Sequence, residues 1–379
     1  MNKKYFSWKW MIGAFCILFL ANCKVPYDPP VKSSNAHYLV VEGYLNGNGP
    51  TSIRLSRTRN ITRGDTAGYI NETGAHLVIQ DSNNNSFPLY ETGNGNYTGY
   101  SYLYSGNKYR LHITTADHKE YLSDFVAFKQ SPPIDQIGWN IKDGGVQIFV
   151  NTHDPQNNTT FYRWEYQETW EFHSQYYSML KYNPVDTNVI PRTEPVYQCW
   201  RSQNSTNILL GSSAKLKEDA INAAPILYIP NHDKRISVLY SIMVTQYALD
   251  SSGYNYWYAM KGNTENVGSI FDPQPNMTRG NIQCTTDPSE TVIGYIGAGN
   301  AVQQRIFIRN ADLPAGWNLM PDCIESLVPN IKDSLLFYFS NNSFIPYLQD
   351  MATGRYLSAS GSCVDCTLTG SPVKPTFWP

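Results

Sequence analysis

The chain has 379 residues, which is long enough for two domains. Its formal net charge is −2 and no stretch is rich in lysine or arginine, which argues against nucleic acid as a partner because such binding depends on cationic contacts with phosphate. Charged residues make up only 16% of the chain, whereas 28 tyrosines and 9 tryptophans are present. Together with many small polar residues, this composition is typical of an exported, β-rich protein.

The N-terminus contains a short apolar segment, residues 10–21, preceded by three lysines. A membrane-spanning helix needs about 20 apolar residues, so this segment is too short to span. A positive leading region followed by about 7 to 15 apolar residues is the form of a secretory signal. The sequence therefore predicts a signal peptide over residues 1–22.

The segment ends at Leu20-Ala21-Asn22-Cys23, which resembles the bacterial lipobox, with Asn22 where that pattern favours Gly, Ala or Ser. The resemblance implies cleavage before Cys23 and lipidation of that residue. Residues 23–36, with three prolines, then form a stiff tether. Loss of residues 1–22 would move the net charge to −5, because three lysines and no acids are removed. The alternative is a soluble periplasmic protein with a free Cys23 thiol.

Residues 37–130 contain seven short alternating segments separated by turn signals such as "NGNG" and "DSNNNS". Seven strands in about 90 residues predict an immunoglobulin-like or transthyretin-like β-sandwich. The glycine-rich pieces lack a GK[ST] ending and a following helix, so we interpret them as hairpin turns and not as phosphate loops.

After two prolines at 132 and 133, residues 131–379 start a second, larger domain, for which we predict a β-sandwich with one helix over residues 251–266. Its most distinctive strand is "FYRWEYQETWEFH" at 161–173. Period two places Trp164, Glu168 and Trp170 on an aromatic face. Arg163, Glu171 and His173 lie on the opposite face, which is expected to be solvent-exposed. The final apolar segment "DSLLFYF" is predicted as a strand.

Glu168 stands among aromatic residues, where a carboxylate needs either a cationic partner or a raised pKa. An arginine from a neighbouring strand is the simpler explanation, and a general acid of a hydrolase is the alternative. A solvent-exposed strand face commonly carries several polar side chains. We therefore interpret Glu165, Glu171 and His173 as surface residues and not as a metal site. The sequence therefore predicts no catalytic residue, no metal site and no cofactor.

A long loop rich in Gly, Pro and Asn follows the predicted helix. Long ordered loops are often functional, so this region either faces a ligand or is a structural crossover. The residues that it would present to a ligand are Asn263, Glu265, Asn266, Asp272 and Gln274.

Five cysteines remain after Cys16 and Cys23, and in an exported protein they are disulfide candidates: Cys199, Cys284, Cys323, Cys363 and Cys366. Residues 363–366, "CVDC", have the spacing of a redox motif, but the following "TLTGSPVKP" does not read as the helix that a thioredoxin-type pair requires. We instead expect a structural disulfide between Cys323 and one member of the terminal pair. Five thiols leave one unpaired if two bridges form.

Several segments together resemble a family of Bacteroidota outer-membrane lipoproteins described only as a domain of unknown function. They are "YLVVEGYL" (38–45), "DPQNNTTFYRWEYQETWEF" (154–172), "GSIFDPQPNMTRGNIQC" (268–284), "RIFI" (305–308) and "CVDCTLTGSPVKPTFWP" (363–379). Members are typically encoded beside TonB-dependent receptors, so the resemblance implies an accessory role in nutrient uptake. The family has no established catalytic residues, so the resemblance implies none in this chain.

The hypothesis from the sequence is thus a non-enzymatic, lipid-anchored outer-membrane protein that works with a TonB-dependent receptor, by capturing a ligand of undefined identity or by supporting the receptor. A surface hydrolase of glycans or peptides is one alternative, and an adhesin or envelope-assembly factor is another. The first acidic residue after Cys23 is Asp28, and the sequence does not decide between the periplasmic face and the cell surface.

Replacing Cys23 with alanine tests the anchor. We expect the Cys23→Ala protein to leave the outer-membrane fraction, because the thiol that would carry the lipid is gone. Cell fractionation with immunoblotting measures this, and Cys16→Ala, inside the predicted signal peptide, is the control. An unchanged membrane fraction for Cys23→Ala would contradict lipid anchoring at this residue.

Overall fold

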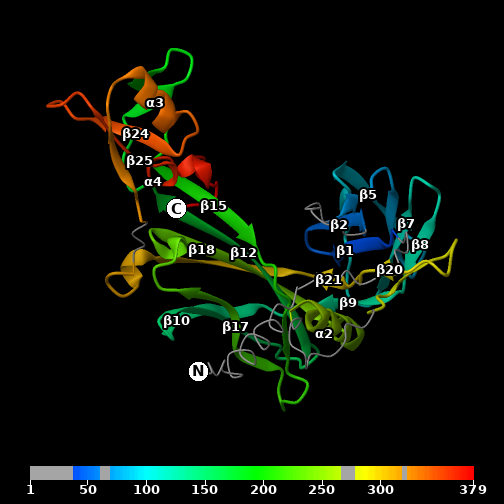
Figure 1. The fold of residues 1–379 in the computed structure, drawn as a ribbon. Helices are drawn as coiled ribbons and strands as arrows, with labels where there is room; N and C mark the ends of the chain where they lie inside the picture. Colours follow the sequence, from blue (N-terminus) through cyan, green and yellow to red (C-terminus); the bar gives the residue numbers. More distant parts are fainter. Residues whose placement is uncertain (1–36, 60–68, 266–277, 318–321) are drawn as a thin grey trace, which may run out of the picture.

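The computed structural model describes residues 37–59, 69–265, 278–317 and 322–379. The predicted signal peptide and tether, including Cys23, lie outside these residues, as do Asn266, Asp272 and Gln274. The predicted mostly β class is confirmed, whereas the predicted pair of sandwiches is not (Figure 1). Within the described ranges, no helix has the length and apolar character needed to cross a membrane.

The N-terminal strands form a sheet that closes on itself as a barrel-like ring of eight strands. Around the ring each strand pairs with the next, and the last pairs with the first: β7 (Lys108–Thr114), β4 (His76–Asp81), β5 (Ser86–Gly93), β6 (Asn96–Tyr100), β2 (Pro50–Arg57), β1 (Leu39–Asn46), β21 (Ala298–Asn300) and β9 (Val126–Gln130). Four short strands extend it, namely β3 (Ile70–Asn71), β8 (Glu120–Ser123), β19 (Ile282–Cys284) and β20 (Val292–Ile293).

Alternation along these strands fills the ring with apolar side chains, as period two requires. Leu39, Ile53, Leu77 and Ile113 are fully buried in this core. The last of the seven predicted segments, "EYLSDFVAF" at residues 120–128, is divided into β8 and β9, which both pair with β7. The remaining predicted strands between residues 37 and 128 occur as predicted.

A late segment, residues 282–300, completes the N-terminal ring. β19 pairs with β8, β20 (Val292–Ile293) pairs with β1, and β21 lies parallel between β1 and β9. Glu290 fixes the same segment by accepting hydrogen bonds from Arg57, Lys119 and Tyr121. The domain boundary between residues 130 and 131 remains a prediction. The strand pairings of residues 282–300 join segments from both sides of that boundary.

The second body consists of two sheets that share one hydrophobic core. One sheet contains β10 (Ile134–Lys142), β11 (Gly145–His153) and β17 (Ala220–Pro230). The other contains β12 (Phe161–His173), β15 (Gln198–Asn204), β16 (Leu209–Ser212), β18 (Leu239–Leu249) and β22 (Val302–Arg309). Short 3-10 turns, η1 (Lys234–Ile236) and η2 (Asn310–Asp312), flank β18 and β22.

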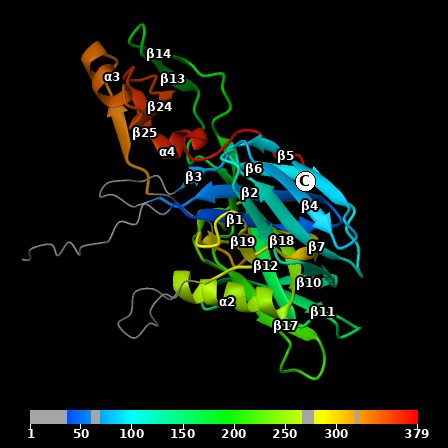
Figure 2. The same cartoon turned by 90° about the vertical axis from the view of Figure 1, so that its right-hand side faces the viewer.

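The predicted helix is present as α2 (Ser251–Glu265), which packs beside β12, β16 and β18 (Figure 2). Asp250 caps it, because its carboxylate accepts a hydrogen bond from the Gly253 backbone N–H at 2.7 Å. The same carboxylate accepts the Tyr295 hydroxyl at 2.9 Å, which ties the start of the helix to the segment that completes the ring.

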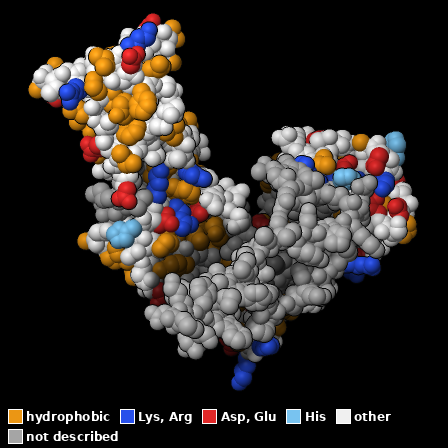
Figure 3. All heavy atoms as spheres, viewed as in Figure 1, with side chains coloured by type: hydrophobic (Ala, Val, Ile, Leu, Met, Phe, Trp, Pro, Cys, Tyr) orange, Lys and Arg blue, Asp and Glu red, His pale blue; other side chains and the backbone are white. Residues whose placement is uncertain are grey.

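A small C-terminal module stands apart from the barrel, with a hollow between them (Figure 3). The predicted strand "DSLLFYF" is wrong, since this stretch forms a helix in which Leu335 and Phe339, four residues apart, are both buried. The module contains β13 (Leu180–Asn183), β14 (Asn188–Pro191), β23 (Glu325–Val328), α3 (Lys332–Phe339), β24 (Phe344–Gln349), β25 (Tyr356–Ser360), α4 (Gly361–Val364) and η3 (Cys366–Leu368).

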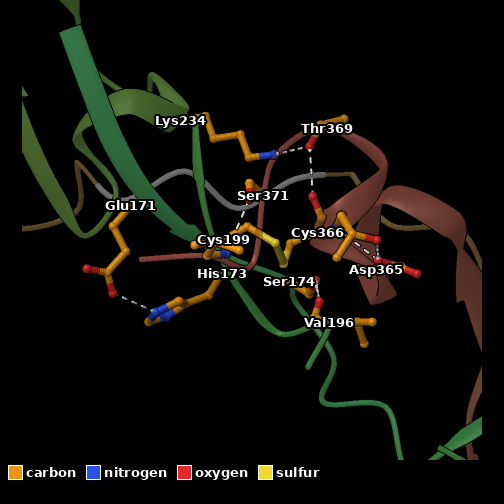
Figure 4. Close-up of a disulfide and its surroundings, with 12 residues drawn as sticks. Glu171, His173, Ser174, Val196, Cys199, Lys234, Asp365, Cys366, Thr369 and Ser371 are labelled. Atoms are coloured by element: carbon orange, nitrogen blue, oxygen red, sulfur yellow. Dashed lines mark hydrogen bonds and ion pairs between the residues drawn. A yellow bond between two sulfur atoms is a disulfide. The ribbon is translucent and has the colours of Figure 1, made fainter. Parts of the chain in front are cut away.

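Two disulfides fix the C-terminal segment, and Figure 4 shows the one between Cys199 and Cys366. Cys323 pairs with Cys363, and Cys199 on β15 pairs with Cys366, so the two cysteines of "CVDC" have different partners. As the count of five thiols and two bridges requires, one thiol stays unpaired, and among the described cysteines it is Cys284. It lies buried in the core of the ring, whereas the other four belong to the cores of the second body and the C-terminal module.

Gly294 tests the junction between the ring and the late segment. Its φ is +147°, and a Cβ atom there would lie 2.3 Å from the Val41 carbonyl oxygen. We expect Gly294→Ala to lower the free energy of unfolding by about 1–3 kcal/mol through overpacking against backbone. Gly262→Ala, in α2 with open space around it, is the control and should stabilise by about 0.5–1 kcal/mol. Thermal or urea unfolding measures both, and equal effects would contradict the close approach.

Candidate functional site

A cavity of about 850 Å³ lies at the junction of the ring and the second body. β1 forms one wall, β12 and β18 form another, and α2 with residues 293–295 closes a third. Concave sites of this size at the boundary of two structural units are typical of small-molecule binding. The lining residues that matter below are Glu42, Tyr44, Arg163, Glu165, Tyr247, Tyr256, Trp257 and Tyr295.

Arg163 on β12 is the buried cation of this cavity. Its guanidinium carbon lies 4.6 Å from the centre of the Tyr247 ring and 4.4 Å from that of Trp257. Nη1 pairs with the Glu165 carboxylate at 2.6 Å, whereas the buried Nε has no hydrogen-bond partner. The sequence pattern predicts that this face of β12 is solvent-exposed. That expectation is wrong at Arg163, which is only 9% exposed because α2 and the ring cover it.

Tyr44 reaches the same cavity from β1 of the ring. Its ring packs edge-on against Tyr247, with centroids 4.9 Å apart. Its hydroxyl is buried and has no hydrogen-bond partner. Burial, partly offset by the charge of Arg163, raises the pKa of Tyr44 far above its usual value, so the phenol stays neutral and retains its proton.

The other tyrosines of the cavity are also neutral. Burial and then Glu165 raise the pKa of Tyr247, which donates its hydroxyl to Glu165 at 3.0 Å. Burial raises the pKa of Tyr256 to about 12. The charges at the cavity are therefore Arg163, Glu165 and, at an exposed position, Glu42.

This arrangement is suited to binding. Buried polar groups are nearly always hydrogen-bonded, and leaving one without a partner costs about 1–3 kcal/mol. Arg163 and Tyr44, whose buried Nε–H and hydroxyl are two such donors, both line this cavity together with aromatic residues. A ligand with an acceptor oxygen and a flat ring would satisfy the donors and contact the rings.

Of the loop residues predicted to face a ligand, the two that the structure describes, Asn263 and Glu265, are not among the residues that line the cavity. Asn263 donates to the Thr278 hydroxyl at 3.1 Å, and Glu265 accepts from the Ile208 backbone N–H and lies 3.7 Å from Lys261. The same helix does contribute Tyr256, Trp257 and Met260 to the cavity. The signal that sequence reasoning missed is the aromatic run "YNYWY" at 254–258.

Glu168 has the cationic partner that the simpler explanation required. Arg235 lies 3.2 Å from its Oε2, and the Tyr240 hydroxyl donates to the same oxygen at 3.0 Å. The arginine comes from the 3-10 turn η1 and not from a neighbouring strand, which corrects that detail. The buried carboxylate is thus part of a structural ion pair.

Glu171 and His173 are linked by a hydrogen bond of 3.1 Å, shown in Figure 4. Glu171 is 9% exposed because the C-terminal segment covers it, and the Trp378 indole N–H donates to its Oε2 at 2.9 Å. Across the described ranges, no group of three or more His, Cys, Asp or Glu side chains is arranged to hold a metal ion.

The fold defines a mostly β protein in which a late segment closes an N-terminal ring and forms a cavity with the second body. The chain belongs to the DUF4249 family, a domain of unknown function, whose model matches residues 24–305. This confirms the part of the resemblance that concerned a family of unknown function. No relative was found among curated proteins.

The ion pair of Glu168 gives a stability prediction. We expect Arg235→Met to lower the free energy of unfolding by about 3 kcal/mol, because it leaves Glu168 buried without its cation. The double variant Arg235→Met/Glu168→Gln should recover part of this loss, since glutamine can still accept the Tyr240 hydroxyl. Urea unfolding is the measurement, with the exposed Arg355→Met as control. A double variant no more stable than Arg235→Met would contradict the pair.

Proposed function

We propose that this protein is a lipid-anchored outer-membrane protein that binds a small ligand in the cavity and works with a TonB-dependent receptor in nutrient uptake, without catalysing a reaction itself. The observation that carries the proposal is the cavity of about 850 Å³ with two buried donors that lack partners. The ligand would be a small molecule with at least one acceptor oxygen and a flat face.

The cavity supports ligand capture because its polar groups are held in place before a ligand arrives. Arg163 is fixed between two aromatic rings and by Glu165, so little side-chain entropy is lost on binding. The Tyr44 hydroxyl and the Arg163 Nε–H are buried in the free protein, so the cost of removing water from them is already met by folding. Binding of a ligand with an acceptor oxygen would then give these donors hydrogen-bond partners.

The sequence supports the anchor and the partner. The short apolar segment and Leu20-Ala21-Asn22-Cys23 favour lipidation at Cys23, and the proline-containing tether would hold the barrel away from the membrane surface. The resemblance to lipoproteins encoded beside TonB-dependent receptors favours a receptor as the partner. The Glu168–Arg235 ion pair gives the burial of Glu168 a structural reason, so the hydrolase alternative has no separate support from this residue.

Tyr44→Phe separates binding from folding. It removes a hydroxyl that has no partner in the protein, so stability should be unchanged or slightly higher. Affinity for the native ligand should fall about three- to tenfold, because one hydrogen bond is lost. We would isolate the natively expressed protein in detergent, identify bound small molecules by native mass spectrometry and co-purified proteins by proteomics.

The wild-type protein should retain both a small molecule and an outer-membrane receptor, and Tyr44→Phe should retain the receptor with less small molecule. Tyr102→Phe, at a tyrosine that is 90% exposed, is the matched control. Recovery of neither a receptor nor a small molecule with the wild-type protein would overturn the proposal. Recovery of an adhesion or assembly partner instead would favour that alternative.

A further inference from the structure

A second cavity, of about 450 Å³, lies in the second body where β12, β15, η1 and the C-terminal segment meet. It shares no lining residue with the cavity described above. Its lining combines cations with aromatic rings: Trp170, Phe172, Arg201, Gln203, Asp233, Lys234, Arg235 and Thr369.

One of the three cations is already neutralised. Arg235 pairs with Asp233 at 2.8 Å and with Glu168 at 3.2 Å. Asp233 also accepts the Arg235 backbone N–H at 2.8 Å, so its carboxylate is committed to this turn. Glu168 and Asp233 together exceed the single charge of Arg235, so the two acids and the three cations at this cavity sum to a net charge of +1.

Lys234 and Arg201 have no such compensation. Among the described residues, neither has a carboxylate within ion-pair distance. Lys234 Nζ lies 3.6 Å from the centre of the Phe172 ring and donates to the Thr369 hydroxyl at 3.2 Å (Figure 4). Burial, and then the positive charge of Arg201, lower the pKa of Lys234. Two unpaired positive charges therefore stand close enough to destabilise each other.

Trp170 adds a neutral donor. Its side chain is buried, and the indole Nε1–H has no hydrogen-bond partner. It lies directly opposite Arg201 in the pairing of β12 with β15, and the Arg201 guanidinium carbon is 5.8 Å from its ring. Lys234, Arg201 and Trp170 carry donors only, which is the pattern that an oxyanion requires.

The C-terminal segment is held rigidly at this cavity. The Cys199–Cys366 disulfide joins it to β15, and Trp200 exchanges two backbone hydrogen bonds of 2.8 Å with Ser371. Thr369 lies between these two attachments and accepts from Lys234. The Lys234 ammonium group is thus held in place by its contact with a segment that the disulfide and the backbone hydrogen bonds fix.

We propose that this second cavity binds a small acidic ligand through its carboxylate, sulfate or phosphate group, with Lys234, Arg201 and the Trp170 indole as donors. The anion offsets the net positive charge of these groups and gives the indole N–H an acceptor. The site does not depend on the ligand proposed for the first cavity, so either assignment can fail without the other.

Isothermal titration calorimetry with sulfate, inorganic phosphate and D-glucuronate tests the proposal, with neutral D-glucose as the comparison. We expect at least one of the three anions to bind at millimolar concentration or below, more weakly at higher ionic strength. Lys234→Met and Arg201→Gln should each weaken this binding about tenfold to a hundredfold, since each removes a charged donor. Trp170→Phe keeps the aromatic ring, loses the N–H and should weaken it about threefold or more.

Lys215→Met, at an exposed lysine outside the cavity, is the matched control and should bind like the wild type. Circular dichroism and thermal unfolding establish that each variant is folded. Binding of none of the anions by the wild type would overturn the proposal. Binding that survives both Lys234→Met and Arg201→Gln, or glucose binding as tight as glucuronate binding, would also overturn it.

Discussion

The pairing of β21 between β1 and β9 is the interaction on which the rest of this structure depends. Without it, both strands would present unpaired backbone N–H and C=O groups along an open edge. Three residues from far along the chain close the ring, and the neighbouring β20 and β19 add further pairs. The N-terminal barrel is therefore completed by residues that also lead directly into β22 of the second body.

The first cavity is a consequence of that closure. Because β1 is fixed beside residues 293–299, Tyr44 is brought against Tyr247 of β18, and Arg163 of β12 becomes buried below α2. The cavity walls thus come from segments that are far apart in the sequence. The second cavity depends in a similar way on a long-range link, the Cys199–Cys366 disulfide, which places Thr369 beside Lys234.

Local pattern was sufficient for the strands and for one helix. Alternating segments gave β1, β4, β7 and β12, and the helix predicted over residues 251–266 is α2. It failed for residues 333–339, because a short apolar run satisfies a strand and a buried helix equally well. It also failed for the far face of β12, since polar side chains on a strand do not reveal whether another element will cover them.

The sequence settled the mostly β class, the membership of a family of unknown function, and the need for a partner at Glu168, because each depends on residues close together in the chain or on an ordered set of motifs. The tertiary structure decided which arginine pairs with Glu168 and which cysteines form disulfides. It also decided that Tyr44 and Arg163 line the same cavity. These facts depend on contacts between residues 40 or more positions apart, and periodicity and spacing carry no information about such contacts.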